Sequence, residues 1–144
     1  NESLEGTPAD PKARRSFDTY DEALNTMIDE TYNTALSNNF KIEYGAAIFK
    51  YPDDDKFYTN GVRNSGRPDA VKLNDCYPYD EPGVELVAFI HSHPWGPEPN
   101  SSPFNITDLD YGIHNPDRYV ISRHHVYRLA PGETDWYKGW TIYR

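Results

Sequence analysis

The sequence predicts a mixed α/β (α+β) domain in which one long helix precedes a series of strands. Over residues 17–36 the apolar side chains recur at intervals of three and four, which is the spacing of an amphipathic helix. Residues 85–90 (ELVAFI) hold a continuous β-forming apolar run, the pattern of a central strand covered on both faces. Shorter strand candidates follow at residues 119–121, 125–129 and 140–143, so the chain is expected to build a sheet with helical cover.

The N-terminal part of the chain contains residues that mark element boundaries. Residues 1–15 contain Gly and Pro without apolar periodicity and are expected to form a linker or arm, which leaves residues 16–144 as one domain. Asp18 or Thr19 can cap the predicted helix, and Thr19 has the spacing of a capping box with Glu22. The helix therefore has a defined start.

The middle of the chain predicts a hairpin, a long excursion and the central strand. Residues 41–51 and 57–59 are β-formers on either side of a Pro-Asp-rich turn, which is typical of a hairpin. Residues 60–80 are rich in Gly, Pro and Asn and are expected to be largely irregular. Pro94 ends the central strand, and a Pro-rich loop then leads to a short helix predicted over residues 105–113.

Charge and composition exclude several functional classes. The 144 residues include 14 Lys and Arg against 23 Asp and Glu, a net charge of −9, which argues against a protein that coats DNA or RNA. No apolar run approaches the roughly 20 residues of a membrane-spanning helix, and the acidic start does not resemble a signal peptide, so we expect a soluble chain. The missing initiator Met suggests a fragment or a processed product. The single cysteine, Cys76, excludes an internal disulfide, a zinc finger and the paired-cysteine site of zinc deaminases, so any metal must be held by histidine and carboxylate.

Two histidines at the end of the central strand carry the strongest chemical signal. Side chains two residues apart on a strand face the same side, so His91 and His93 can converge on one spot and hold a cation. Imidazoles are also common as satisfied polar groups at strand ends, and the pair alone would favour that simpler interpretation. A second pair, His124 and His125, has adjacent residues that face opposite sides, and we interpret it as structural.

A third ligand would have to come from elsewhere in the chain. Catalytic zinc generally has three protein ligands and one open position, and Asp108 and Asp110 are the nearby carboxylates. If Asn105 caps the predicted short helix, Asp108 lies in its first turn; if Thr107 is the cap, Asp110 takes that position. We favour Asp108, because the loop then ends at Asn105 and the following apolar residues form one stripe.

These motifs together resemble the JAMM (JAB/MPN-plus) family of zinc metalloproteases. Residues 90–94 (IHSHP) are similar to the family's His-x-His-Pro element, and residues 104–108 (FNITD) to its Ser-x-x-Asp element, with Asn105 in place of the serine. Residues 42–48 (IEYGAAI) place Glu43 where the family has a glutamate in the first strand after the first helix. The resemblance is greatest to uncharacterised bacterial JAB-like domains at the C-terminal ends of Rhs-type polymorphic toxins.

The resemblance implies a fold, a cofactor and a reaction. The fold would be a JAMM-like, cytidine-deaminase-like three-layer arrangement with a mixed central sheet flanked by helices. Zn²⁺ would be held by His91, His93 and Asp108, with Glu43 as the general base and Asn105 as a hydrogen-bond donor to the oxyanion. The substrate would be a protein or peptide, and a toxin module would have a cognate immunity protein. Such a module would be delivered to a target cell, or would be cytoplasmic.

Two other classes of function compete with this interpretation. The JAMM fold also occurs in metal-free scaffolds, which would tolerate the exchange at Asn105. Retention of Glu43, His91, His93 and Asp108 argues against this alternative. A metal-dependent nuclease toxin would fit the Rhs-type context, and the net charge of −9 disfavours it. Bound zinc with peptide cleavage, absence of metal, and nucleic-acid cleavage would distinguish the three.

Overall fold

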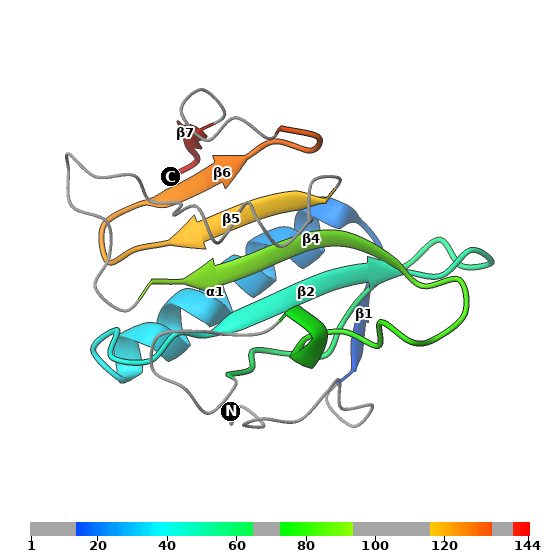
Figure 1. Cartoon of the computed structure of the whole chain (residues 1–144), viewed down its shortest axis with the longest axis horizontal. Helices are drawn as coiled ribbons and strands as arrows, with labels where there is room; N and C mark the ends of the chain where they lie inside the picture. The colour runs from blue at the N-terminus through cyan, green and yellow to red at the C-terminus, as the bar shows by residue number, and fades with distance from the viewer. Residues whose placement is uncertain (1–13, 65–72, 94–115, 134–139) are drawn as a thin grey trace.

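The structure is a computed structural model that describes residues 14–64, 73–93, 116–133 and 140–144. Within these ranges the chain forms one α-helix and a seven-stranded mixed sheet with the order β1-β3-β2-β4-β5-β6-β7, which confirms the α/β (α+β) prediction (Figure 1). The elements are β1 (Arg15–Phe17), α1 (Tyr20–Ser37), β2 (Gly45–Lys50), β3 (Phe57–Thr59), the 3-10 helix η2 (Leu73–Asp75), β4 (Glu85–Ser92), β5 (Asp117–Ile121), β6 (Val126–Leu129) and β7 (Trp140–Ile142). The short helix expected at residues 105–113 lies outside the described residues.

Helix α1 begins where the capping pattern indicated. Thr19 is the N-cap, and its hydroxyl accepts a hydrogen bond from the backbone N–H of Glu22 at 3.1 Å. This settles the choice between Asp18 and Thr19. The helix ends at Ser37, and the chain turns back toward the sheet through Asn39 and Phe40, both with positive φ. The backbone N–H of Phe40 donates to the carbonyl of Ala35 at 2.7 Å, which fixes the direction of the turn.

The sheet is antiparallel except at its centre. Strands β2 and β3 pair antiparallel, as predicted for a hairpin, and β2 also pairs antiparallel with β4. Strands β4 and β5 run parallel, and β6 and β7 continue the sheet as antiparallel neighbours. Strand β1 adds an edge to β3 and begins at Arg15, so the last residue of the expected arm belongs to the sheet. Strand β4 is therefore an interior strand with partners on both sides, as its continuous apolar run predicted.

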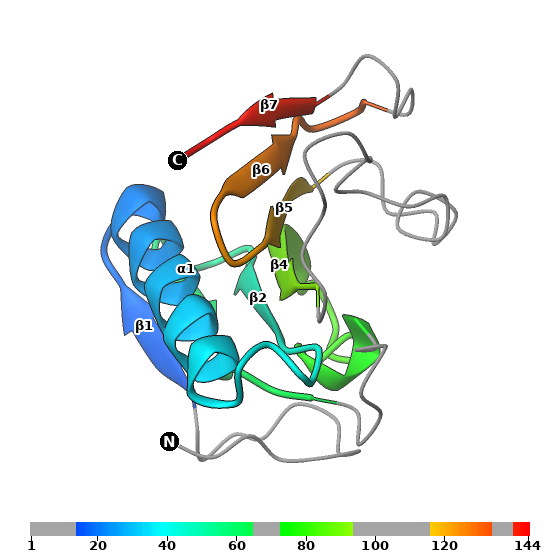
Figure 2. The same cartoon turned by 90° about the vertical axis from the view of Figure 1, so that its left-hand side faces the viewer.

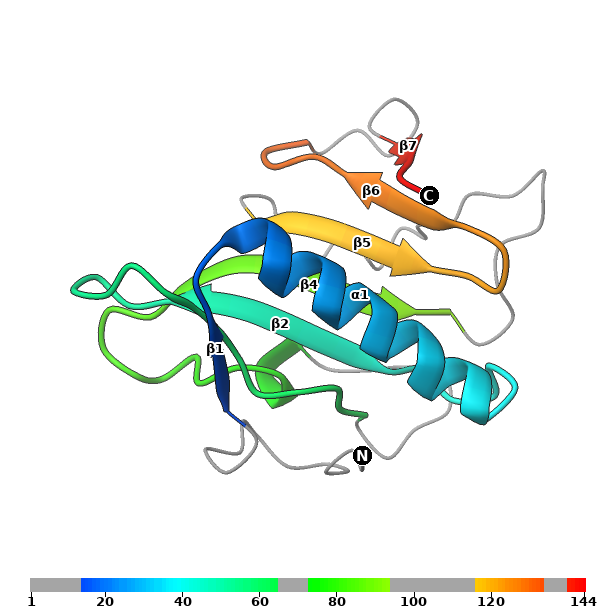
Figure 3. The same cartoon turned by 180° about the vertical axis from the view of Figure 1, so that it is seen from behind.

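The two faces of the sheet have different cover. Helix α1 lies across one face, over β2 and β4 (Figure 3), where Ile48, Ile90 and Tyr119 belong to the main hydrophobic core. On the other face η2 covers a smaller buried cluster that contains Ala47, Cys76 and Phe89 (Figure 2). Successive residues of a strand alternate between these faces.

A buried carboxylate joins α1 to the second half of the sheet. Asp117, at the start of β5, is 6% exposed and accepts hydrogen bonds from the Tyr20 hydroxyl at 2.6 Å and the Tyr119 hydroxyl at 3.1 Å. The Arg128 Nε donates to the same carboxylate at 2.8 Å. The first turn of the helix, β5 and β6 are thus connected through one acidic group, on the face that α1 covers.

Candidate functional site

Three of the sequence-predicted site residues lie within the described part of the chain. Glu43 lies two residues before β2, His91 lies in β4 and His93 follows β4. Asn105 and Asp108, together with the alternative ligand Asp110, lie outside the described residues. Within the described residues, the candidate site consists of Glu43, His91 and His93, which lie at the neighbouring ends of β2 and β4.

The register between β2 and β4 brings Glu43 to His91. Gly45 is the pairing partner of His91, and the pairing continues one step further through Tyr44 and Ser92. The Ser92 N–H donates to the Tyr44 carbonyl at 2.8 Å, and the Tyr44 N–H donates to the Ser92 Oγ at 3.0 Å. Ser92 thus has the structural position expected of a residue that faces away from the two histidines. These paired bonds fix the backbone next to Glu43 against β4.

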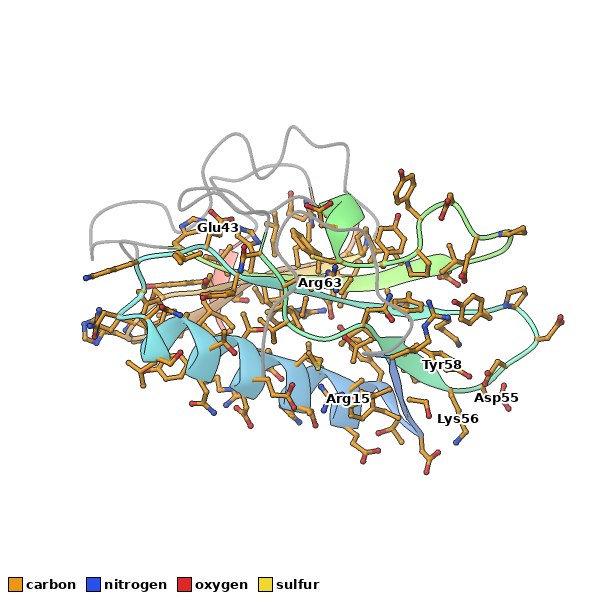
Figure 4. All side chains as sticks on the ribbon, turned by 90° about the horizontal axis from the view of Figure 1, so that it is seen from below. Arg15, Glu43, Asp55, Lys56, Tyr58 and Arg63 are labelled. Atoms are coloured by element: carbon orange, nitrogen blue, oxygen red, sulfur yellow. The ribbon has the colours of Figure 1, made fainter. Side chains whose placement is uncertain are left out.

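Glu43 and His91 are close together and shielded from solvent. The Glu43 Oε2 lies 3.9 Å from the His91 Nε2, and the two side chains are 11% and 6% exposed. Glu43 lies on the side of the sheet away from α1 (Figure 4). A carboxylate and an imidazole at this separation can share a water or a cation, because each group offers a lone pair or a proton toward the same small volume.

The two histidines lie on one face of β4, as the alternation predicted. The ring centroids of His91 and His93 are 5.2 Å apart, and Phe89 stacks on the other side of His91 at 5.3 Å. The backbone N–H of His93 donates to the Ile121 carbonyl at 3.0 Å, so the pairing with β5 continues past the end of β4. Two imidazoles are thus held side by side by backbone pairing, which is a donor set that suits zinc.

A buried arginine and the single cysteine lie near this site. Arg63 is 1% exposed, and its backbone exchanges two 2.8 Å hydrogen bonds with Gly45, two residues after Glu43 (Figure 4). The thiol of Cys76 is fully buried, and this burial raises its pKa to about 12. The positive charge of Arg63 acts against that shift, whereas the negative charges of Asp75 and Glu43 add to it. Glu43, Arg63 and Cys76 therefore share one electrostatic environment.

Sequence reasoning did not single out Arg63 as part of this environment. Arg63 lies in the Gly- and Asn-rich stretch that was expected to be irregular, and a single arginine there has no periodic pattern that could indicate burial. Its position comes from the bridge to Gly45, which links residues that are far apart in the chain. Arginine side chains are rarely buried, so the sequence alone gave no reason to expect burial of Arg63.

The Cys76 thiol is expected to be unreactive in the folded protein. Only the thiolate is an effective nucleophile, and burial both hides this sulfur and raises its pKa to about 12. A maleimide or aromatic disulfide reagent at pH 8 should therefore label no cysteine in the native chain, and one per chain in denaturant. Rapid labelling of the native chain would contradict the described burial.

The described residues do not by themselves form a complete metal site. Among residues 14–64, 73–93, 116–133 and 140–144 there is no group of three or more His, Cys, Asp or Glu side chains placed to hold a metal ion. His91 and His93 have the donor chemistry for zinc, and a third ligand would come from outside these ranges, where Asp108 and Asp110 lie. The described histidines thus fit the expected group.

Comparison of the chain with protein-family models, with curated proteins and with solved structures found no match. In the part of the chain that the structure describes, no helix combines the length and the hydropathy needed to cross a membrane.

Proposed function

We propose that this protein is a zinc-dependent peptidase or isopeptidase of the JAMM type. The observation that carries the proposal is the buried pairing of Glu43 with His91 at 3.9 Å, beside His93 on the same face of β4. The proposal includes the three-layer JAMM-like fold, and the cover of the sheet by α1 on one face and η2 on the other supports it. The role as an effector module with an immunity partner is part of the same proposal and is supported by the sequence resemblance alone.

The proposed ligands are His91, His93 and Asp108. Zinc bound by them would act as a Lewis acid that polarises the substrate carbonyl and makes water a nucleophile near neutral pH. The pairing of β2 with β4 holds His91, and the bond from the His93 N–H to Ile121 holds the following turn. The backbone at both histidines is thus fixed before any metal binds, which reduces the conformational entropy lost on binding.

Glu43 is proposed to move the proton. A general base has to lie within hydrogen-bond reach of the proton it removes, directly or through one water, and Glu43 is held beside the proposed ligand His91. Its carboxylate takes a proton from the attacking water as the carbon–oxygen bond forms. It then gives that proton to the amine as the carbon–nitrogen bond breaks. Asn105 is proposed to donate its amide N–H to the developing oxyanion.

The proposal is tested first by metal content. Purified protein, supplemented with zinc and then freed of loosely bound metal, should hold about one zinc per chain by elemental analysis. The double variant His91→Ala/His93→Ala should lose it. The double variant His124→Ala/His125→Ala is the matched control, because it removes two exposed histidines from the turn after β5 and should keep the metal.

The remaining ligand and the competing functions are decided by the same samples. Asp108→Asn should lower zinc content, and Asp110→Asn should leave it unchanged; the reverse result would assign the ligand to Asp110. Equal metal in the parent and in the His91→Ala/His93→Ala variant would overturn the enzyme proposal in favour of a metal-free scaffold. Cleavage of nucleic acid in place of peptide would favour the nuclease alternative.

A further inference from the structure

A second candidate site lies on the opposite face of the sheet from Glu43 and His91. A pocket of about 210 Å³ opens between the C-terminal half of α1, the turn from β5 to β6, and the end of the described chain at Arg144. The buried side chains of Ile28 and Val126 form part of its lining. Figure 2 shows that the turn from β5 to β6 curves toward the side of the sheet on which α1 lies.

Basic and hydrogen-bond-donating groups gather around this pocket. Arg123, His124, His125 and Arg144 all line it, and Asp29 is the acidic side chain among the lining residues. The whole chain has a net charge of −9, so this grouping runs against its overall charge. The His125 ring packs against the Tyr127 ring, with the centroids 5.8 Å apart, so the histidine donor is His124, whose imidazole can donate an N–H whether it is neutral or protonated. The lining is therefore rich in donors for an anion.

Two arginines are held at the pocket by contacts that each use one of the five N–H donors of the guanidinium. Arg123 Nη2 donates to the Asn39 carbonyl at 3.0 Å, and its guanidinium lies 5.2 Å from the centroid of the Phe40 ring. Arg144 Nη1 forms an ion pair with Asp29 at 2.8 Å. A guanidinium carries five N–H donors in a rigid fork, which suits phosphate and carboxylate oxygens. The ion pair offsets the charge of Asp29, so Arg123 supplies the uncompensated positive charge.

We propose that this pocket binds a small phosphate-type oxyanion. The volume of about 210 Å³ lies below the roughly 300–1,000 Å³ of pockets for drug-sized ligands, so a phosphate with little attached to it fits better than a nucleotide. A phosphate has more terminal oxygens than a carboxylate, so it can engage the fork of Arg123 and a further donor such as His124 at the same time. This site is independent of the proposed zinc site, because the two lie on opposite faces of the sheet.

The test is binding of inorganic phosphate to the full chain in the presence of a chelator, so that no metal can capture the anion. Phosphate should raise the melting temperature of the parent in a saturable way, measured against sodium chloride at equal ionic strength. Arg123→Gln should weaken the apparent affinity about tenfold or more. Arg15→Gln removes the same charge from an exposed pair with Glu30 and should behave like the parent.

A measurement on the unmodified protein covers the case in which Arg123→Gln fails to fold. The ring resonances of His124 should shift in an NMR titration with phosphate, and acetate should shift them less. Equal responses to phosphate and chloride, or a shift that acetate reproduces, would overturn the proposal. A parent-like response of a folded Arg123→Gln variant would overturn it as well.

Discussion

Replacing Glu43 with glutamine is expected to lower amide hydrolysis by about 10²–10⁴-fold while the protein keeps its zinc. Glutamine has nearly the same shape, but it cannot take a proton from the attacking water. The carboxylate lies 3.9 Å from His91 and is largely buried, so bulk water does not readily replace it as a base. The measurement is cleavage of a mixed peptide library by the zinc-loaded protein, followed by mass spectrometry, with metal content determined on the same samples.

The control for this experiment makes the same chemical change on a neighbouring strand. Glu85 is exposed at the start of β4, at the other end of that strand from His91, and Glu85→Gln should keep full activity. A Glu43→Gln variant that cleaves peptides at the parental rate would remove Glu43 from the mechanism. It would leave the zinc proposal to be judged by metal content alone.

The second large effect concerns stability. Asp117→Ala should lower the free energy of unfolding by about 3 kcal/mol, because the change leaves a partly buried arginine and two tyrosine hydroxyls without their shared acceptor. Arg128 Nε, the Tyr20 hydroxyl and the Tyr119 hydroxyl all donate to this carboxylate. Urea unfolding followed by circular dichroism would measure the loss. Asp29→Ala, which breaks the exposed pair with Arg144, is the matched control and should cost less than about 1 kcal/mol.

The same cluster is expected to make the folded state less stable at high pH. Burial raises the pKa of Tyr20, and the hydrogen bond to Asp117 raises it further. A group whose pKa is raised in the folded state stabilises the fold below its unfolded pKa and loses that contribution as the pH rises. Stability of the parent should therefore fall above about pH 10, where an unfolded tyrosine ionises. A stability that stays flat to pH 12, or an Asp117→Ala variant as stable as the parent, would contradict the described network.

Periodicity predicted the elements that bury an apolar stripe or run. The spacing in residues 17–36 gave α1, and the apolar run of residues 85–90 gave an interior strand. Strand β1 could not be predicted, because its three residues have no pattern of their own and become a strand by pairing with β3.

In the candidate site, too, the sequence predicted the local arrangement and missed contacts between distant segments. The spacing of two residues was enough to place His91 and His93 on one face, because alternation is a local property of a strand. The contact between Glu43 and His91 depends on the register of β2 against β4, which joins residues far apart in the chain. Only the family resemblance suggested that pairing from the sequence, and nothing in the sequence pointed to Arg63.

The alternation of β4 has a consequence for how this protein can vary. Ile90 lies in the hydrophobic core under α1, and Ser92 bonds to the backbone of Tyr44, whereas His91 and His93 lie between and beside them on the opposite face. Selection for folding alone therefore acts most strongly on Ile90 and Ser92, and selection for the proposed chemistry acts on the two histidines. Drift in a lineage that had lost the activity would then replace every second residue of this segment and preserve those between.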